Sequence, residues 1–167
     1  MINRYRVKIC GITDEVNYSE LKKYQIDYFG FIFYEKSPRY ILNNPDHAFI
    51  KNIKNKVAVF VDENIDTVIS ILEKYNFSYV QLHGNESTKR CSYIRNKFDL
   101  PIIKAFGIKN KKDLDSALFY EGVVDYFLFD AKQENAGGQK GGLNKVFDWK
   151  ILPVSYTHLR AHETRTY

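Results

Sequence analysis

The sequence predicts a parallel α/β fold, in which strands and helices alternate along the chain. Short apolar runs alternate with amphipathic stretches, and the runs recur at intervals of roughly 20 to 30 residues, which is typical of strand–helix units. Several runs are apolar almost throughout rather than at every second position, as strands covered on both faces require. The six candidate strands are residues 7–10, 28–34, 57–61, 79–82, 102–106 and 126–129.

Helical patterns fill the intervals between these runs. The clearest one follows Asn64, a favourable N-cap, and places Ile65, Val68, Ile69 and Leu72 on one face at helical spacing. The other predicted helices cover residues 14–24, residues 44–53 with Asn44 as N-cap and Pro45 as first helical residue, residues 86–98, and a stretch that Asn110 begins and Gly122 ends.

Two arrangements fit this alternation, a doubly wound sheet and a (β/α)8 barrel. No G-x-G-x-x-G follows the first candidate strand, which weakens the dinucleotide-binding form of the doubly wound sheet. A complete barrel needs about 200 residues or more. The six candidate units end near residue 130, so a barrel with about six of its eight units is the form of that fold that this sequence allows.

Composition limits the class of protein. The chain has 167 residues, 44% of them hydrophobic and 27% charged, which suits one globular domain with a sizeable core. Its longest apolar stretches are far shorter than the roughly 18 residues of a membrane-spanning helix, and its first residues lack the apolar run of a signal peptide. The net charge of +5 is spread along the chain as solvated surface, so we expect no nucleic-acid partner. Two cysteines fit a reducing compartment, and we expect a cytoplasmic protein.

The last part of the chain differs in character from the rest. Residues 153–167 have no helical period and little apolar content, and they resemble a translated sequencing-adapter sequence. The alternative is an ordinary flexible terminus. We therefore expect an α/β domain over residues 1–152 and a non-native tail over residues 153–167.

Cysteine is the first residue type that could carry chemistry. Cys10 ends the first candidate strand, and in a parallel barrel the carboxyl ends of the strands form the catalytic rim. Taken alone, a cysteine at a strand end is more often a packing residue than a catalytic one, because reactivity needs a lowered pKa or a nearby base. Cys91 lies on the apolar face of a predicted helix, and we expect it in the core.

Charged and polar residues follow three other candidate strands. Asp130 follows the sixth strand, where a carboxyl group can point into a cleft as a general acid or act only as a turn residue. Arg39 follows the second strand, where a guanidinium can bind a carboxylate or phosphate or simply lie on the surface. Gln81 and His83 close the fourth strand, and a single histidine there is usually a hydrogen-bonded structural group.

A glycine-rich loop follows Asp130. Gly141 and Gly142 belong to it, and the loop lacks the spacing of a nucleotide-binding loop, so a mobile cover over the strand end is the better interpretation. His and Cys do not recur at metal-ligand spacing, and we expect no metal site.

Together these motifs resemble one enzyme family. The combination is similar to phosphoribosylanthranilate isomerase, a (β/α)8-barrel enzyme of tryptophan biosynthesis, over about residues 5–152. The matching segments are VKICGIT at 7–13, FGFIF at 29–33 followed by SPRYI at 37–41, VFV at 59–61, QLHG at 81–84, and FD at 129–130 with GGLNKVFDW at 141–149.

The resemblance implies an Amadori rearrangement without a cofactor. N-(5'-phosphoribosyl)anthranilate would become 1-(2-carboxyphenylamino)-1-deoxyribulose 5-phosphate, with Asp130 as general acid and Cys10 as general base. Arg39 would hold the anthranilate carboxylate, and Gln81, His83, Gly141 and Gly142 would bind substrate. Strands one and six of a barrel lie across its mouth from each other, so the acid and the base would face one pocket.

The sequence departs from this family in two places. Asn144 stands where the family's Gly-Gly-x-Gly loop has its last glycine, and nothing matches the seventh and eighth strands, whose loops form the phosphate site in such barrels. We therefore expect a C-terminally truncated isomerase, with an inactive or poorly folded fragment as the alternative. A further alternative is another phosphate-binding barrel, such as an epimerase or indole-glycerol-phosphate synthase, and the latter would have to use Lys8 or Lys104 as its catalytic lysine. The sequence assigns no oligomeric state.

Overall fold

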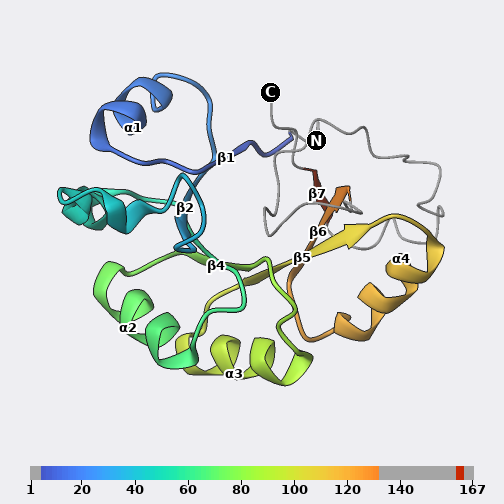
Figure 1. Ribbon diagram of the computed structural model, residues 1–167. Helices are drawn as coiled ribbons and strands as arrows, with labels where there is room; N and C mark the ends of the chain where they lie inside the picture. The colour runs from blue at the N-terminus through green and yellow to red at the C-terminus, as the bar shows by residue number, and fades with distance from the viewer. Residues whose placement is uncertain (1–4, 132–160, 164–167) are drawn as a thin grey trace. The chain divides into compact units, whose positions relative to one another are not determined.

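Two compact units make up the chain. The computed structural model describes residues 5–131 and 161–163. The chain divides into unit 1, Met1–Val80, and unit 2, Gln81–Tyr167. Both units are built from strands connected by helices, and neighbouring strands within each unit pair in parallel (Figure 1). The structure therefore confirms the parallel α/β class.

Unit 1 places the first candidate strands side by side. β1 pairs with β2 in parallel, with Cys10 opposite Gly30, and β2 pairs with β3, with Phe29 opposite Lys56. Aromatic rings fill its core; the rings of Phe33 and Phe60, for example, stack with centroids 5.5 Å apart. Its elements are β1 (Lys8–Cys10), α1 (Glu15–Leu21), β2 (Tyr28–Phe33), the 3-10 helices η1 (Ile41–Asn43) and η2 (His47–Asn52), β3 (Lys56–Phe60), α2 (Ile65–Tyr75) and the first half of β4 (Tyr79–Leu82).

Helix α2 forms where the sequence predicts it. The side-chain oxygen of Asn64 accepts the backbone N–H of Asp66 at 2.8 Å, so Asn64 is the N-cap. Val68 and Leu72 are buried as expected. The predicted apolar face therefore packs into unit 1.

The predicted α-helix over residues 44–53 is wrong, because this segment forms a turn followed by the single 3-10 helix η2 instead. The side chain of Asn44 accepts the backbone N–H of Asp46 at 2.9 Å and donates to the carbonyl oxygen of Thr13 at 2.9 Å. The Asn44 carbonyl lies 2.7 Å from Nδ1 of His47. These local side-chain bonds compete with the helical pattern and hold the chain in turns.

Lys56 is an exception to the expected solvated charge. It begins β3, one residue before the predicted strand, and it is only 3% exposed. Its Nζ donates to the carbonyl oxygens of Ile50 at 2.8 Å and Lys51 at 3.1 Å, and burial lowers the pKa of Lys56. The ammonium thus ties η2 to β3.

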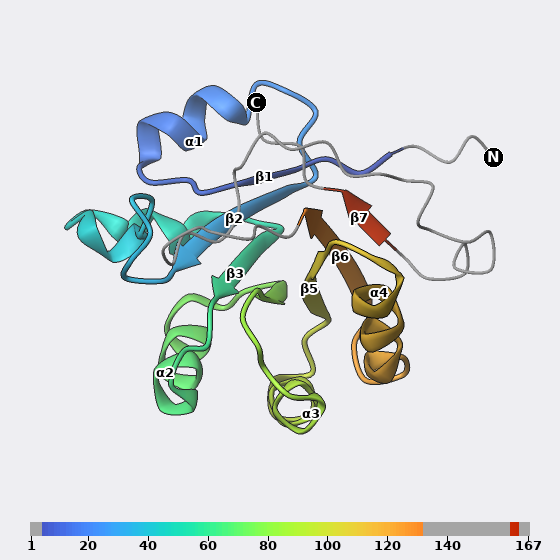
Figure 2. The same cartoon turned by 45° about the vertical axis from the view of Figure 1, so that its right-hand side comes forward.

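Unit 2 continues the same repeat. β5 pairs with β6 in parallel, and Figure 2 shows β5, β6 and β7 side by side. Helix α4 packs against β5. Its elements are the second half of β4, α3 (Thr88–Phe98), β5 (Ile102–Ile108), α4 (Lys111–Ala117), the 3-10 helix η3 (Leu118–Tyr120), β6 (Tyr126–Ala131) and β7 (Ala161–Glu163).

The helix boundaries of unit 2 differ slightly from the predicted ones. Helix α3 begins at Thr88 with Ser87 as N-cap, later than expected. Asn110 caps α4 in a reciprocal capping box with Asp113, as its side chain accepts the N–H of Asp113 and the Asp113 side chain accepts its own N–H. Gly122 has φ +74° and follows η3, so it ends the helical segment after an added 3-10 turn.

The strand β7 lies within residues 153–167, the expected non-native tail. It pairs with β6 in parallel, with Phe127 opposite Ala161. It is a seventh strand beyond the six candidates, in a segment with little apolar content. Gly141 and Gly142 lie outside the described residues. Within residues 5–131 and 161–163, no helix is long and apolar enough to cross a membrane.

The core of unit 2 can be tested on helix α3. Ile94 is fully buried, and the neighbouring Tyr93 is 49% exposed on the same helix. We expect Ile94→Ala to lower the free energy of unfolding by about 2–5 kcal/mol, because it removes buried methyl groups and leaves a cavity. Tyr93→Ala should cost about 1 kcal/mol or less. Urea denaturation of the two variants measures the difference, and equal losses would contradict this packing.

Candidate functional site

Cys10 is held at the carboxyl end of β1 beside a glycine of β2. The side chain of Cys10 is partly exposed. A Cβ added at Gly30 would lie 2.8 Å from Cys10 Sγ and 3.1 Å from Cys10 Cα. Real Cβ atoms essentially never come that close, so Gly30 provides the room in which the thiol lies.

Arg39 lies against the same strand end. Its Nη1 donates to the backbone carbonyl of Cys10 at 3.0 Å. Gly11 has φ +92°, and a Cβ there would come within 2.7 Å of Arg39 Cδ. The backbone N–H of Gly11 also donates to the carbonyl of Gly30 at 2.9 Å. In unit 1 the structure therefore brings together a thiol and a guanidinium at the carboxyl ends of β1 and β2.

His83 and Asp130 form the corresponding pair in unit 2. His83 follows β4, and Asp130 lies near the carboxyl end of β6. Nε2 of His83 is 3.7 Å from Oδ2 of Asp130, and the two side chains are 20% and 26% exposed. Gln81 on β4 lies beside the imidazole, with its Nε2 3.2 Å from His83 Nδ1. A partly exposed imidazole and a partly exposed carboxyl group thus lie close together at the carboxyl ends of β4 and β6.

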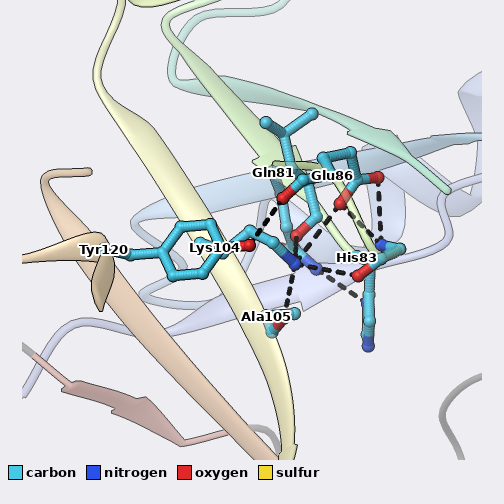
Figure 3. A network of polar contacts seen from close by, with 8 residues as sticks. Gln81, His83, Glu86, Lys104, Ala105 and Tyr120 are labelled. Atoms are coloured by element: carbon cyan, nitrogen blue, oxygen red, sulfur yellow. Dashed lines mark hydrogen bonds and ion pairs between the residues drawn. The ribbon is translucent and has the colours of Figure 1, made fainter. Parts of the chain in front are cut away.

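A buried ion pair supports the loop that carries His83, as Figure 3 shows. Nζ of Lys104 on β5 lies 3.3 Å from Oε2 of Glu86, and the side chains are only 3% and 1% exposed. Lys104 also donates to the carbonyls of Leu82 at 3.4 Å, Gly84 at 2.9 Å and Ala105 at 2.8 Å. These bonds fix the backbone on both sides of His83.

The Glu86 carboxylate completes this network. It accepts the backbone N–H of Gly84 at 3.0 and 2.9 Å, and the Glu86 carbonyl accepts the hydroxyl of Tyr120 at 2.9 Å. Burial raises the pKa of Tyr120, and the nearby Cys91 and Glu86 raise it further. The hydroxyl therefore stays protonated and serves as a donor.

Cys91 lies in the core, as the sequence predicts. It is fully buried on α3. Burial raises the pKa of Cys91 to about 11; Glu86 raises it and Lys104 lowers it. Because the thiolate is the reactive form, Cys91 is inert near neutral pH.

The predicted site residues thus fall into two groups. Cys10 and Arg39 lie together in unit 1, and Gln81, His83 and Asp130 lie together in unit 2. Sequence reasoning missed the Glu86–Lys104 pair. The signal was present, since a lysine within the otherwise apolar 102–106 needs a buried partner.

Lys104 is therefore occupied in holding the backbone. This disfavours Lys104 as the catalytic lysine that an indole-glycerol-phosphate synthase would need. The other candidate, Lys8, has a buried Nζ that makes no hydrogen bond among the described residues. The residues that the structure describes contain no group of three or more His, Cys, Asp or Glu side chains that could hold a metal ion.

Comparison with known proteins identifies the family. The model of the N-(5'-phosphoribosyl)anthranilate (PRA) isomerase family matches residues 7–161. The chain belongs to this isomerase family. The match includes every described residue of both groups, from Cys10 to Asp130.

Individual relatives agree with this assignment. N-(5'-phosphoribosyl)anthranilate isomerase of Parabacteroides distasonis is 38% identical over 150 residues, which are 87% of this chain and 66% of that protein. The isomerase of Paramagnetospirillum magneticum is 38% identical over 151 residues, 87% of this chain and 69% of that protein. The chain thus spans about two thirds of the length of these relatives.

Solved structures show the same fold. Phosphoribosyl anthranilate isomerase from Thermotoga maritima matches with a TM-score of 0.76 and 33% identity, over 92% of this chain and 72% of that one. A second solved isomerase, in complex with reduced 1-(o-carboxyphenylamino)-1-deoxyribulose 5-phosphate, matches with a TM-score of 0.68 and 33% identity, over 77% of this chain and 66% of that one. The fold of the isomerase-family chain is therefore an incomplete (β/α)8 barrel.

Gly11 and Gly122 both have positive φ, so comparing their substitutions separates the cost of backbone strain from the cost of displacing Arg39. Gly11→Ala and Gly122→Ala each force a residue with a Cβ into positive φ, which costs about 1–2 kcal/mol. Only Gly11→Ala also displaces Arg39, because nothing lies within 4 Å of a Cβ at Gly122. We expect Gly11→Ala to lower the free energy of unfolding by about 1.5 kcal/mol more than Gly122→Ala does. This difference is the order of a lost hydrogen bond from a charged donor, here the bond from Arg39 to the Cys10 carbonyl.

The same substitutions in an Arg39→Ala background test whether the extra cost of Gly11→Ala comes from its clash with the Arg39 side chain. There the cost of Gly11→Ala should fall to that of Gly122→Ala, since the clashing side chain is gone. Urea denaturation of the single and double variants measures these costs. An undiminished Gly11→Ala penalty in that background would show that Arg39 is not the contact that matters.

The buried ion pair gives a second test in unit 2. Glu86→Leu leaves the Lys104 ammonium buried without its carboxylate, and we expect a loss of about 3–5 kcal/mol in unfolding free energy. The double variant Glu86→Leu/Lys104→Met should lose less than Glu86→Leu alone. As a control, Asp115→Ala breaks the exposed Lys111–Asp115 pair and should cost about 0.5 kcal/mol or less. Chemical denaturation of these variants measures the losses, and a double variant that loses as much as Glu86→Leu alone, or more, would contradict the energetic coupling of Glu86 and Lys104.

Proposed function

We propose that this chain carries out the Amadori rearrangement of N-(5'-phosphoribosyl)anthranilate in tryptophan biosynthesis. The observation that supports this most directly is the family match over residues 7–161, which contains all described candidate residues. The proposed partner is a small phosphorylated aminosugar, and the proposed location is the cytoplasm. No cofactor is needed, because the reaction moves a proton and a double bond within one molecule.

Asp130 is the proposed general acid. It gives its proton to the furanose ring oxygen, the bond from that oxygen to the first sugar carbon breaks, and a Schiff base to the anthranilate nitrogen forms. Support comes from its place near the carboxyl end of β6, partly exposed and 3.7 Å from the His83 imidazole. A donor beside the carboxyl group stabilises the carboxylate that remains after proton transfer.

Cys10 is the proposed general base. Its thiolate removes the proton from the second sugar carbon, and the electron pair forms the enolamine, which then tautomerises to the ketone. Support comes from the partly exposed thiol at the carboxyl end of β1, where Gly30 leaves room for it. The oxidation of the second carbon balances the reduction of the first, so no external oxidant takes part.

Substrate binding is proposed for the remaining candidates. A guanidinium has five N–H donors, and the bond from Arg39 to the Cys10 carbonyl uses one, so Arg39 suits the anthranilate carboxylate. Gln81, His83, Gly141 and Gly142 stay predicted binding residues, and the two glycines lie outside the described residues. The pairing of Cys10 with Asp130 over one pocket is likewise a prediction.

The division of the chain is also a proposal. We retain residues 1–152 as the isomerase part and residues 153–167 as a non-native tail. The family match to residue 161 and the strand β7 both extend into this segment.

The second candidate function is an inactive or poorly folded fragment of the isomerase. It is favoured by the observation that the chain covers about two thirds of the relatives' length.

Matched variants test the proposed roles. Cys10→Ala and Asp130→Asn should each lower kcat by about 100-fold or more, the range for losing a general base or acid. Cys91→Ala and Asp99→Asn are the controls, because Cys91 is a buried thiol and the exposed Asp99 has φ +50°, which asparagine tolerates. The measurement is conversion of N-(5'-phosphoribosyl)anthranilate, resolved from its product by liquid chromatography, together with growth of a tryptophan auxotroph that lacks this step.

The outcomes separate the two candidates. If the 167-residue chain converts the substrate and still does so after Cys10→Ala or Asp130→Asn, the role assigned to the substituted residue is wrong. No turnover by the unmodified chain, with no cooperative unfolding transition, would favour the inactive fragment.

A further inference from the structure

We infer that Gln81 is a positioning residue: it determines which nitrogen of the His83 imidazole carries the proton, and so which group His83 presents to Asp130. The inference rests on the proposed function, because it gives the Asp130 carboxyl a partner in proton transfer. Gln81 acts through His83.

The place of Gln81 in β4 is costly for a polar side chain. The residue is 2% exposed and stands between Val80 and Leu82, which are also buried. Its Oε1 is buried and has no hydrogen-bond partner among the described residues. An unsatisfied buried polar atom costs about 1–3 kcal/mol, so an apolar residue would suit this position better for stability alone.

The amide contact fixes the state of the imidazole. Gln81 Nε2 lies 3.2 Å from His83 Nδ1 and has only N–H groups to offer. Nδ1 must then accept, and the neutral ring carries its proton on Nε2. That nitrogen is the one 3.7 Å from Asp130 Oδ2 (Figure 3 shows Gln81 and His83).

This arrangement suits the proposed proton transfer. When Asp130 releases its proton, a negative charge develops on a carboxyl group that is three-quarters buried, and an N–H directed at it stabilises that charge. The opposite tautomer would direct a lone pair at the carboxylate. The distance of 3.7 Å is longer than a hydrogen bond, and such contacts commonly tighten when substrate binds.

The backbone around His83 is rigid enough to hold this geometry. Leu82 and Gly84 on either side of His83 both accept from Lys104, and Gly84 also donates to Glu86. The imidazole is therefore held between a fixed strand end and the amide of Gln81. Changing the amide alters the tautomer without releasing the loop.

Nitrogen-15 NMR of histidine-labelled protein at mildly alkaline pH reads the tautomer directly. In the unmodified chain we expect His83 to be protonated at Nε2, and a His83→Asn variant identifies its signals. His47 is the internal reference of opposite tautomer, because its Nδ1 lies 2.7 Å from the Asn44 carbonyl, which can only accept. Gln81→Met should leave His83 a mixture of tautomers, and Gln81→Glu should move its proton to Nδ1.

Kinetics test the consequence for Asp130. Gln81→Met should lower kcat about tenfold, as for the loss of one hydrogen bond to a charged group, whereas a raised KM with unchanged kcat would support substrate binding by Gln81 instead of positioning. The variant's free energy of unfolding should not fall, because the unsatisfied amide oxygen is removed. Gln25→Leu is the matched control at an exposed glutamine and should change neither quantity.

The tautomer of His83, the kcat of Gln81→Met and the turnover of the unmodified chain test three different statements. Protonation of His83 at Nδ1 in the unmodified chain, or an unchanged tautomer in Gln81→Met, would overturn the inference. A changed tautomer with unchanged kcat would overturn the positioning role. Absence of turnover in the unmodified chain would count against the proposed function, and the tautomer measurement would still decide whether Gln81 sets the state of His83.

Discussion

The buried ammonium of Lys104 is the constraint on which the described site of unit 2 depends. A charge that is 3% exposed is tolerated only when it is paired and hydrogen-bonded, and here Glu86 and three backbone carbonyls supply the partners. Two of those carbonyls belong to Leu82 and Gly84. The segment that carries His83 therefore has the conformation that solvates Lys104, and the position of the imidazole follows from it.

A steric constraint has the equivalent role in unit 1. Gly30 and Gly11 lack the Cβ atoms that would meet Cys10 and Arg39, at 2.8 and 2.7 Å respectively. The thiol and the guanidinium can approach the carboxyl ends of β1 and β2 because two backbone positions carry no side chain. In both units, residues without a proposed chemical role set the positions of those that have one.

The sequence predicted the repeat well and the local exceptions poorly. Apolar runs covered on both faces gave all six strands within a few residues, and the cap at Asn64 was correct. The helix over 44–53 failed because the side chain of Asn44 bonds to Thr13, far away in the sequence. Apolar periodicity also cannot show which groups stabilise Lys56 and Lys104, because the carbonyls that accept from them are brought near only by the fold.

The two cysteines show what the fold adds to residue type and spacing at the site. The sequence places Cys10 at a strand end and Cys91 on the apolar face of a helix, and the fold shows how far each free thiol is exposed. Cys91 is fully buried, and its pKa of about 11 keeps it protonated. Cys10 is partly exposed at a strand end, and its carbonyl binds the Arg39 guanidinium. A base that removes a proton from carbon must reach the substrate and exist as a thiolate, so burial alone excludes Cys91 and leaves Cys10 as the candidate.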